Sequence, residues 1–460
     1  MNMHRHMHLH RHTHALTPPD NRETSPYSAL DARSTALGPD TITRRVLDNG
    51  LTVLVYPNAT TPSLVARLAV KGGAMYDPPD KAGLAAFTVR AMRRGTARRT
   101  FDQINEDTEG RGASVGVDAG KTLMDAGGRA LKEDARFLLE TMAEIVLWPS
   151  FPPEEIEKLR VQIRTSLIEL ENDTGSVADR AFRETVYPQG HPYYYRTSGY
   201  LETLDNISRE DMQAFYRKYF RPERATLVVV GDVQPEEIVD HVRVLFGDWH
   251  SSPEEPEPYA IADPPSLQGV TTVYRHVPGK TQNDIVLGHP SLRRTDPDYY
   301  AFDLMNLLLG RIGLMGRLGK TVRDEQGLAY YVSSSFEAGL GAGPWAVRAG
   351  VNPANVHRAI DSIRREIERI RTEPIPREEV EGGKRYMTGV MPLRLETSDG
   401  LARAILEMEL FNLGFDYISR YPDIIGALTP EDVSAVAARR LSPEHCAVAI
   451  AGPPLPEAQG

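Results

Sequence analysis

Arg323 and Tyr330 are the residues of this chain whose chemistry and spacing first suggest a reaction. Arginine carries a permanent charge on a planar fork of donors, and tyrosine carries one phenolic donor at the end of a rigid ring. Such a pair could hold a peptide carbonyl and stabilise an oxyanion that develops on it. The alternative is structural: Arg323 would interact with a helix C-terminus, and Tyr330 would pack with one edge exposed.

The sequence around this pair predicts a helix, a stop and two strands. Gly327 is the expected end of the helix, because glycine readily adopts the left-handed conformation that follows a helical C-terminus. The segment 328–336 is rich in β-branched, aromatic and hydroxyl residues, which is typical of a strand. Three glycines should then turn the chain into a second strand: Gly339, Gly341 and Gly343. Arg323 would lie in the last helical turn and Tyr330 in the first strand, where both could face one cleft.

The residues from Arg323 to Tyr330 resemble a motif in the second half of the M16 metallopeptidases, the family of pitrilysin, insulinase and mitochondrial processing peptidase. In that family an Arg precedes Gly-Leu-Ala-Tyr, a strand and a Gly-rich turn. This chain has Gly327-Leu328-Ala329-Tyr330 after Arg323. The resemblance implies that Arg323 and Tyr330 complete an active site whose zinc is held by a different half.

The first half of the chain resembles the zinc-binding region of the same family but lacks its ligands. Zinc-bearing members carry H-x-x-E-H on a helix, where the two His bind zinc from one face and the Glu polarises the attacking water. Here the frame from Gly83 to Thr96 is recognisable, yet the functional positions are Ala86, Val89 and Arg90. The third ligand position falls at about Ser166. The resemblance therefore implies that this chain binds no cofactor and that zinc is expected on a partner subunit.

Arg90 replaces a zinc ligand with a fixed positive charge, which would repel a metal ion. It could pair with a nearby carboxylate in a structural role, or it could bind the C-terminus of a substrate. Neither H-x-x-E-H nor H-E-x-x-H occurs elsewhere in the chain. An autonomous hydrolase that uses another metal site therefore has little support.

Three landmarks recur in the same order along the chain, which indicates an internal duplication. The pairs are Pro152-Pro153-Glu154-Glu155-Ile156 with Pro376-Arg377-Glu378-Glu379-Val380, Ile207-Ser208 with Leu428-Thr429, and Pro222-Glu223 with Pro443-Glu444. Their offsets are 224, 221 and 221 residues. We therefore predict an α+β fold of two homologous M16-type halves, each a mainly antiparallel sheet packed with helices.

The duplication also predicts the organisation of the chain. Residues 1–40 should be a disordered tail, whose alternating histidines could instead chelate a transition metal. Residues 41–250 should form the first half, in which the zinc motif is lost. Residues 251–267 are Pro-rich and acidic and should link the halves, and residues 268–454 should form the second half with the Arg–Tyr pair.

Composition narrows the class of protein. The net charge of −10 argues against general binding of nucleic acids, whose phosphates are also negative. No apolar run is long enough to span a membrane. The single cysteine, Cys446, excludes an internal disulfide and a Cys-based zinc site. No secretory signal is recognisable, so a cytoplasmic location is expected, whereas a misassigned start would leave a periplasmic or secreted one open.

The functional hypothesis follows from the asymmetry of the halves. The resemblance implies a non-zinc subunit of a heterodimeric zinc peptidase, inactive alone, whose partner is an M16 chain that carries H-x-x-E-H. A peptide or unfolded polypeptide would bind as an added strand along an edge expected at Ala113, Ser114 and Val115. Gly341 of the Gly-rich turn could contact it, unless these glycines serve only as hairpin turns. The rival hypothesis is a catalytically inactive structural or peptide-binding homologue.

Overall fold

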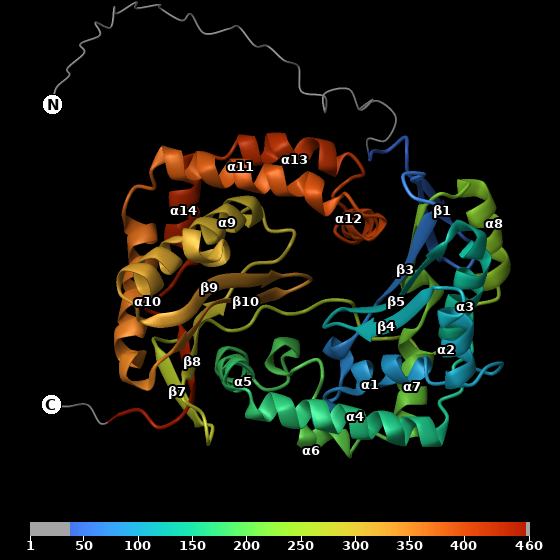
Figure 1. The fold of residues 1–460 in the computed structure, drawn as a ribbon, viewed down its shortest axis with the longest axis horizontal. Coiled ribbons are helices and arrows are strands. Elements are labelled where there is room, and N and C mark those ends of the chain that lie inside the picture. The colour runs from blue at the N-terminus through green and yellow to red at the C-terminus, as the bar shows by residue number, and fades with distance from the viewer. Residues whose placement is uncertain (1–36, 457–460) are drawn as a thin grey trace, which may run out of the picture. The chain divides into compact units, whose positions relative to one another are not determined.

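The computed structural model describes residues 37–456, and the first half of the chain forms one sheet within it (Figure 1). The histidines of the expected N-terminal tail therefore lie outside the described residues. Six strands make up the first sheet: β1 (Thr43–Val46), β2 (Thr52–Pro57), β3 (Ser63–Lys71), β4 (Ser114–Ala119), β5 (Leu123–Leu131) and β6 (Ala225–Gly231). Their order is β1-β2-β6-β3-β5-β4, so β4 forms an edge of this sheet.

The second half forms a sheet of five strands with a matching order. They are β7 (Thr271–His276), β8 (Asn283–Pro290), β9 (Ala329–Ala338), β10 (Ala342–Val351) and β11 (Ala447–Gly452). Their order is β7-β11-β8-β10-β9, which repeats β2-β6-β3-β5-β4 of the first sheet. Within these five corresponding strands the first pair is parallel and the remaining pairs are antiparallel, and β1 adds an antiparallel strand beside β2 in the first sheet. This repeat confirms the predicted α+β fold of two homologous halves.

The burial of the strands follows from their places in the sheets. β6 reads Ala-Thr-Leu-Val-Val-Val-Gly and is buried throughout, because strands flank it on both sides and both of its faces are covered. β4 alternates exposed and buried residues over most of its length and carries Gly116 and Asp118. A small and a charged residue suit an edge strand, since they discourage unwanted pairing with other chains.

Helices cover one face of each sheet. The first half contributes α1 (Leu84–Met92), α2 (Phe101–Glu109), α3 (Ala135–Leu147), α4 (Pro153–Asn172), α5 (Thr174–Val186), α6 (Leu201–Leu204), α7 (Arg209–Tyr219) and α8 (Pro235–Phe246). The second half contributes α9 (Tyr299–Asn306), α10 (Val356–Thr372), α11 (Arg377–Arg394), α12 (Ser398–Leu410), α13 (Tyr417–Gly426) and α14 (Pro430–Arg440). Phe87 of α1 and Leu138 of α3 share a core with Leu68 of β3, which shows how the first sheet is covered.

The opposite faces are covered by helices that the two halves exchange. α5 packs against β8 and β11 of the second sheet, where Phe182 shares a core with Val286 and Ala449. α12 packs against β3 and β6 of the first sheet, where Ile405 shares a core with Val228. Figure 1 shows both helices beside the sheet of the other half. The two halves are therefore interlocked.

Polar contacts reinforce this exchange. Arg67 of β3 donates to Asp399 of α12 at 2.7 Å. Arg348 of β10 donates to Asp179 of α5 at 2.6 Å, and Arg183 of α5 pairs with Glu337 of β9. Ion pairs at an interface fix its register more than they add to its stability.

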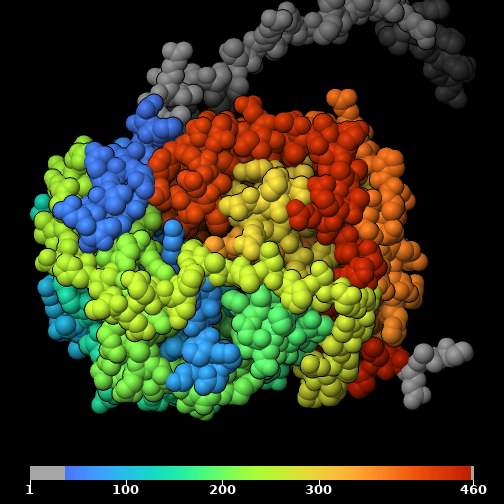
Figure 2. Space-filling model, turned by 180° about the vertical axis from the view of Figure 1, so that it is seen from behind, coloured from blue at the N-terminus to red at the C-terminus, as the bar shows by residue number. Residues whose placement is uncertain are grey.

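The segment 250–270 joins the halves without a helix or strand of its own. Figure 2 shows it in yellow-green, crossing the face of the molecule opposite to that of Figure 1. Ile261 within it is buried and packs with Tyr193 and Phe182. Among residues 37–456, no helix is both long and apolar enough to cross a membrane.

Candidate functional site

A glycine and an aspartate fix the start of α1, which carries the expected zinc-motif positions. Gly83 has a φ of +101°, and a Cβ there would lie 2.9 Å from the backbone oxygen of Ser198. The Asp77 carboxylate accepts the backbone N–H of Gly83 at 2.9 Å and that of Ala85 at 2.8 Å. These bonds satisfy two donors that a helix N-terminus leaves free. Burial raises the pKa of Asp77 to about 7, although the two backbone donors oppose this shift.

The expected zinc-ligand positions meet at one pocket. A cavity of about 240 Å³ is lined by Ala86 and Arg90 of α1, Ser166 of α4 and Asp118 of β4. Val89, at the position where the resemblance places a catalytic Glu, does not line this pocket but is 1% exposed in the core of the first half. The sequence therefore identified three positions that the fold brings together.

The residues of this pocket do not fit a zinc ion. Ala86 has no donor atom, and Arg90 presents a permanent positive charge. Glu171 lies five residues beyond Ser166 on α4, but its carboxylate accepts from Arg196 at 2.8 Å and from Arg180 at 3.2 Å. Among the residues that the structure describes, no group of three His, Cys, Asp or Glu side chains is placed to hold a metal.

Arg90 is exposed at this pocket and is not neutralised by a direct contact. Within residues 37–456 its guanidinium makes no hydrogen bond or ion pair, so the expected carboxylate partner is not found. Desolvation and the nearby charge of Arg94 lower the pKa of Arg90, and Asp118 opposes that shift. Arg94 itself contacts Gln162 at 2.6 Å and Glu155 at 3.7 Å.

In the second half, Tyr330 lies in an irregularity of β9. Tyr331 pairs with Gly350 of β10, whereas Ala329 pairs with Val351, so Tyr330 is an extra residue without an opposite. This β-bulge explains why Tyr330 and Tyr331 are both exposed although strand residues normally alternate. Bulges often re-aim a side chain beside an active site. β9 is also the outermost strand of its sheet.

Arg323 lies in the last turn of a helix, as expected, but the helix has an unusual form. Residues Gly319–Glu325 form a π-helix, which is rare and often found at functional sites. Gly327 follows it with a φ of +60°, and its N–H donates to the Arg323 carbonyl at 3.0 Å. The prediction that Gly327 ends the helix in a left-handed conformation is confirmed.

Both candidate side chains are available to another molecule. Tyr330 is 59% exposed and Arg323 is exposed. No hydrogen bond or ion pair joins them, and neither side chain has such a partner among residues 37–456. The structural role considered for Arg323, a hydrogen bond to the helix end, is therefore not seen among these residues, whereas the partly covered ring of Tyr330 fits the packing role as well.

The expected peptide-binding residues are placed differently from one another. Ser114 is exposed on the edge strand β4, whereas Ala113 and Val115 are buried, so only their backbone faces a possible added strand. Gly341 is buried: a Cβ there would lie 2.7 Å from Ile261, and its carbonyl accepts from the Tyr193 hydroxyl at 3.4 Å. The structure therefore contradicts a direct contact between Gly341 and a substrate, because the connecting segment covers it.

Comparisons with known proteins agree with the duplicated fold. Residues 52–192 match the model of the insulinase family, peptidase family M16, and residues 206–387 match that of the peptidase M16 inactive domain. The chain belongs to the M16 family. An uncharacterized zinc protease of Streptomyces coelicolor is 24% identical over 406 residues, which cover 87% of each chain.

Two further M16 proteins show the range of this likeness. A probable mitochondrial-processing peptidase subunit beta of Schizosaccharomyces pombe is 24% identical over 422 residues, 88% of this chain and 90% of that one. The crystal structure of a peptidase M16 inactive domain from Pseudomonas fluorescens has a TM-score of 0.83 at 23% identity, covering 90% of this chain and 98% of that one. At that identity the structural likeness establishes the fold and not the activity.

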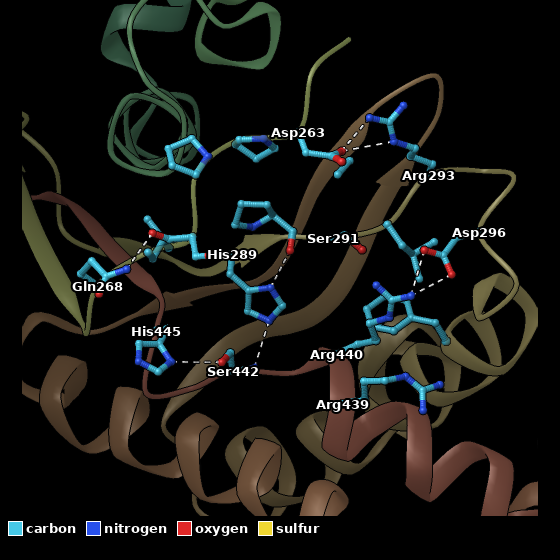
Figure 3. Close-up of a pocket in the computed structure, with 18 residues that line it drawn as sticks. Asp263, Gln268, His289, Ser291, Arg293, Asp296, Arg439, Arg440, Ser442 and His445 are labelled. Carbon is cyan, nitrogen blue, oxygen red and sulfur yellow. Dashed lines mark hydrogen bonds and ion pairs between the residues drawn. The ribbon is translucent and has the colours of Figure 1, made fainter. Parts of the chain in front are cut away.

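A second cavity of this M16 chain has no sequence signature. It has a volume of about 550 Å³ and lies between the connecting segment and the second half (Figure 3). His289 uses both ring nitrogens there: Nδ1 donates to the Pro290 carbonyl at 2.8 Å, and Nε2 accepts the Ser442 N–H at 3.3 Å. Burial lowers the pKa of His289, so the imidazole is neutral.

The arginines of this cavity are all paired with carboxylates, two of them with carboxylates of the cavity itself and Arg439 with Asp298 at 2.6 Å. Arg293 donates to Asp263 at 2.7 Å, and Arg440 donates to Asp296 at 2.9 Å. Sequence reasoning missed the cavity because it forms only when the connecting segment folds back on the second half. Its paired charges and its neutral histidine indicate that the cavity is part of a structural contact between the connecting segment and the second half.

Proposed function

We propose that this chain is the non-zinc subunit of a two-chain M16 peptidase, in which Arg323 and Tyr330 complete the site of an H-x-x-E-H partner. The observation that carries this proposal is the exposure of both side chains without partners in their own chain. They are presented by a π-helix and a β-bulge. Irregular backbone of this kind costs free energy, so it is commonly retained only where function needs it.

The chemistry assigned to the pair is binding and charge stabilisation. The Tyr330 hydroxyl would donate a hydrogen bond to the oxyanion that forms on the scissile carbonyl. Arg323 would hold a neighbouring carbonyl and fix the register of the substrate. The metal and the attacking water belong to the partner, since Ala86 and Arg90 cannot hold zinc. The substrate would be a peptide or an unfolded polypeptide, with β4 as an edge to which it can add as a strand.

The surface of the chain supports a partner of the same duplicated plan. Val161 and Ile168 of α4 are 64% and 46% exposed, two turns apart on one face. Tyr386 and Leu393 of α11 are 50% and 67% exposed with the same spacing. α4 and α11 follow the corresponding Pro152 and Pro376 landmarks of the two halves, so each half offers an apolar pair at a corresponding place.

The charges beside these apolar pairs are complementary. The exposed charged residues of α4 are mainly acidic: Glu154, Glu157, Lys158 and Glu169. Those of α11 are mainly basic: Arg377, Glu378, Arg385 and Arg394. A second M16 chain related by an approximate twofold axis could therefore place α4 of one chain against α11 of the other, twice.

Reconstitution with a partner tests this proposal. An H-x-x-E-H chain of the same organism would be purified, and each chain would be assayed alone and together on fluorescein-labelled casein, which is unfolded. We expect cleavage only by the mixture, together with a heterodimer by light scattering. Ile168→Glu and Leu393→Glu should weaken the heterodimer at least tenfold, whereas Val244→Glu, at an exposed apolar residue of α8, should leave its affinity unchanged.

Two results would contradict the proposal. The first is cleavage by this chain alone with stoichiometric zinc, which would place a metal site elsewhere. The second is full cleavage by a pair that carries both Tyr330→Phe and Arg323→Ala. The alternative function is a catalytically inactive peptide-binding homologue, which the unpaired Arg90 beside an edge strand favours. It predicts peptide binding by the isolated chain and no gain of cleavage with any H-x-x-E-H partner.

A further inference from the structure

We propose that the pocket between α1, α4 and β4 binds the C-terminal residue of a peptide. In this arrangement Arg90 holds the terminal carboxylate, the apolar walls of the pocket hold the last side chain, and the preceding residues extend along β4. The inference takes only the ligand class from the proposed function. It concerns this chain alone and needs no partner.

The walls of the pocket are apolar, which suits a hydrocarbon side chain. The apolar residues that line it come from α1, α4 and the segment around α6: Phe87, Ile163, Leu167, Leu170, Leu204 and Ile207. The volume of about 240 Å³ is below the range of roughly 300–1,000 Å³ that is typical of sites for drug-sized ligands. One amino-acid residue therefore fits this pocket better than a whole small molecule or cofactor does.

Arg90 is the group that selects a carboxylate. Its guanidinium has no hydrogen bond or ion pair among residues 37–456, so its donors remain free for a ligand. A planar guanidinium binds a carboxylate through two parallel hydrogen bonds. A C-terminal carboxamide has only one acceptor oxygen and no negative charge, so it cannot bind in this way. Thr197 and Ser198 also line the pocket and can donate hydroxyl hydrogen bonds, whereas the Ser166 hydroxyl already donates to the Gln162 carbonyl at 3.3 Å.

Asp118 is the one carboxylate that lines the pocket, and it opposes an anionic ligand. Its Oδ1 atom accepts the backbone N–H of Ala119 at 2.9 Å, which holds it at the strand end. Asp125 lies directly opposite on β5, where burial raises its pKa to about 6 and the Asp118 charge adds to that shift. We therefore expect Asp118 to weaken carboxylate binding without abolishing it.

The edge strand gives the peptide its direction. Asp118 and Ala119, the last residues of β4, line the pocket, and β4 is the outermost strand of its sheet. A peptide that pairs with this edge can therefore deliver one of its ends to Arg90. Main-chain pairing tolerates many sequences, so the selectivity should lie in the terminal carboxylate and the last side chain.

Peptide binding to the full chain tests the inference. The probe is fluorescein-Ala-Val-Ala-Val-Leu with a free carboxylate, and its matched control is the same peptide with a C-terminal carboxamide. Fluorescence polarisation should give a Kd at least tenfold lower for the free acid. Replacement of the terminal Leu by Ser should weaken binding of the acid, because the apolar walls lose their contact.

Variants of the chain assign the effect to this pocket. Arg90→Gln should remove the preference for the acid, and Arg90→Lys should restore part of it. Asp118→Asn should tighten binding of the acid about threefold, since an opposing charge is removed. The control is Arg98→Gln, at an exposed arginine of the same half, which should leave both affinities unchanged. Because Arg90 has no partner in the described chain, its replacement should not unfold the protein, and circular dichroism would verify this.

Three outcomes would overturn the inference: equal affinity for acid and amide, an acid preference that survives Arg90→Gln, and octanoate that competes as strongly as the peptide acid. The last would identify a fatty-acid site. None of these results bears on cleavage by the reconstituted pair, which depends on Tyr330 and not on Arg90. Conversely, a pair that fails to cleave leaves the acid preference of the isolated chain intact.

Discussion

The pocket beside β4 and the surface beside β9 adjoin corresponding edge strands of the two halves, but they differ in character. The first is built from an ordinary α-helix whose functional positions have become Ala86, Val89 and Arg90. The second keeps a π-helix and a β-bulge that expose Arg323 and Tyr330. The first half thus combines a regular backbone with side chains that do not fit zinc, whereas the second half uses an irregular backbone to expose two polar side chains. This difference supports a subunit that completes a site held by another chain.

Rebuilding the metal ligands is the strongest test of this contrast. The combined substitution Ala86→His, Arg90→His and Ser166→Glu should give a chain that binds about one zinc ion, because these positions line one pocket. Metal analysis after dialysis should find stoichiometric zinc in this variant and none in the wild type. Ala86→His alone is the control, and a single ligand should not retain zinc. Absence of zinc in the combined variant would show that the frame has lost the ligand geometry as well.

Breaking the helix exchange should affect both halves at once. Phe182→Ala removes a fully buried ring from the contact of α5 with the second sheet and should cost about 3–5 kcal/mol of unfolding free energy. Urea denaturation would measure the loss, and hydrogen exchange should report it in β8 and also in β6 if the halves unfold together. Thr185→Ala on the same helix should change stability by no more than about 0.5 kcal/mol. Loss of protection confined to the second sheet would show that the halves are independent.

Removal of one hydroxyl group at a time distinguishes the roles of the two exposed tyrosines, Tyr330 and Tyr331. Tyr330→Phe should lower kcat of the reconstituted pair about 10²–10³-fold, equivalent to about 2.7–4 kcal/mol of transition-state stabilisation. The neighbour Tyr331 donates its hydroxyl to Asp284 and is not assigned to the reaction, so Tyr331→Phe should keep kcat within about threefold. Equal losses in both variants would indicate a general effect of the strand surface and refute the specific role of Tyr330.

The smallest effect is expected at the end of the π-helix. Gly327→Ala forces a Cβ into the left-handed region and should cost about 1–2 kcal/mol, although nothing lies within 4 Å of the new atom. Gly327→Asn should cost less, because asparagine tolerates that region. Gly389→Ala in the interior of α11 also meets open space and should stabilise the chain by up to about 1 kcal/mol. Thermal unfolding would rank the three variants; a neutral Gly327→Ala would show that this turn is not strained.

The sequence predicted the elements around Gly327 because glycine, strand-forming residues and Gly-rich turns act locally. It could not predict the bulge at Tyr330, since two adjacent tyrosines do not reveal which of them lacks a cross-strand partner. No helix was predicted over 174–186, and the amphipathic pattern of that segment would not have said which sheet its buried face meets. Gly341 was assigned to substrate from its turn-forming chemistry, and only the path of the connecting segment shows that Ile261 covers it.

The exchange of α5 and α12 has a consequence for how the chain is made. During synthesis β6 leaves the ribosome well before α12, which ends at Leu410. Until then the face of the first sheet around Leu54 and Val228 has no helix of its own half to cover it, because α12 is the helix that packs there. The nascent first half must therefore wait, with an apolar face largely unburied, until the chain has been translated through α12, about three quarters of the second half. Folding of this protein is completed from its C-terminal end, and a nascent chain stalled within the second half should be a target for chaperones.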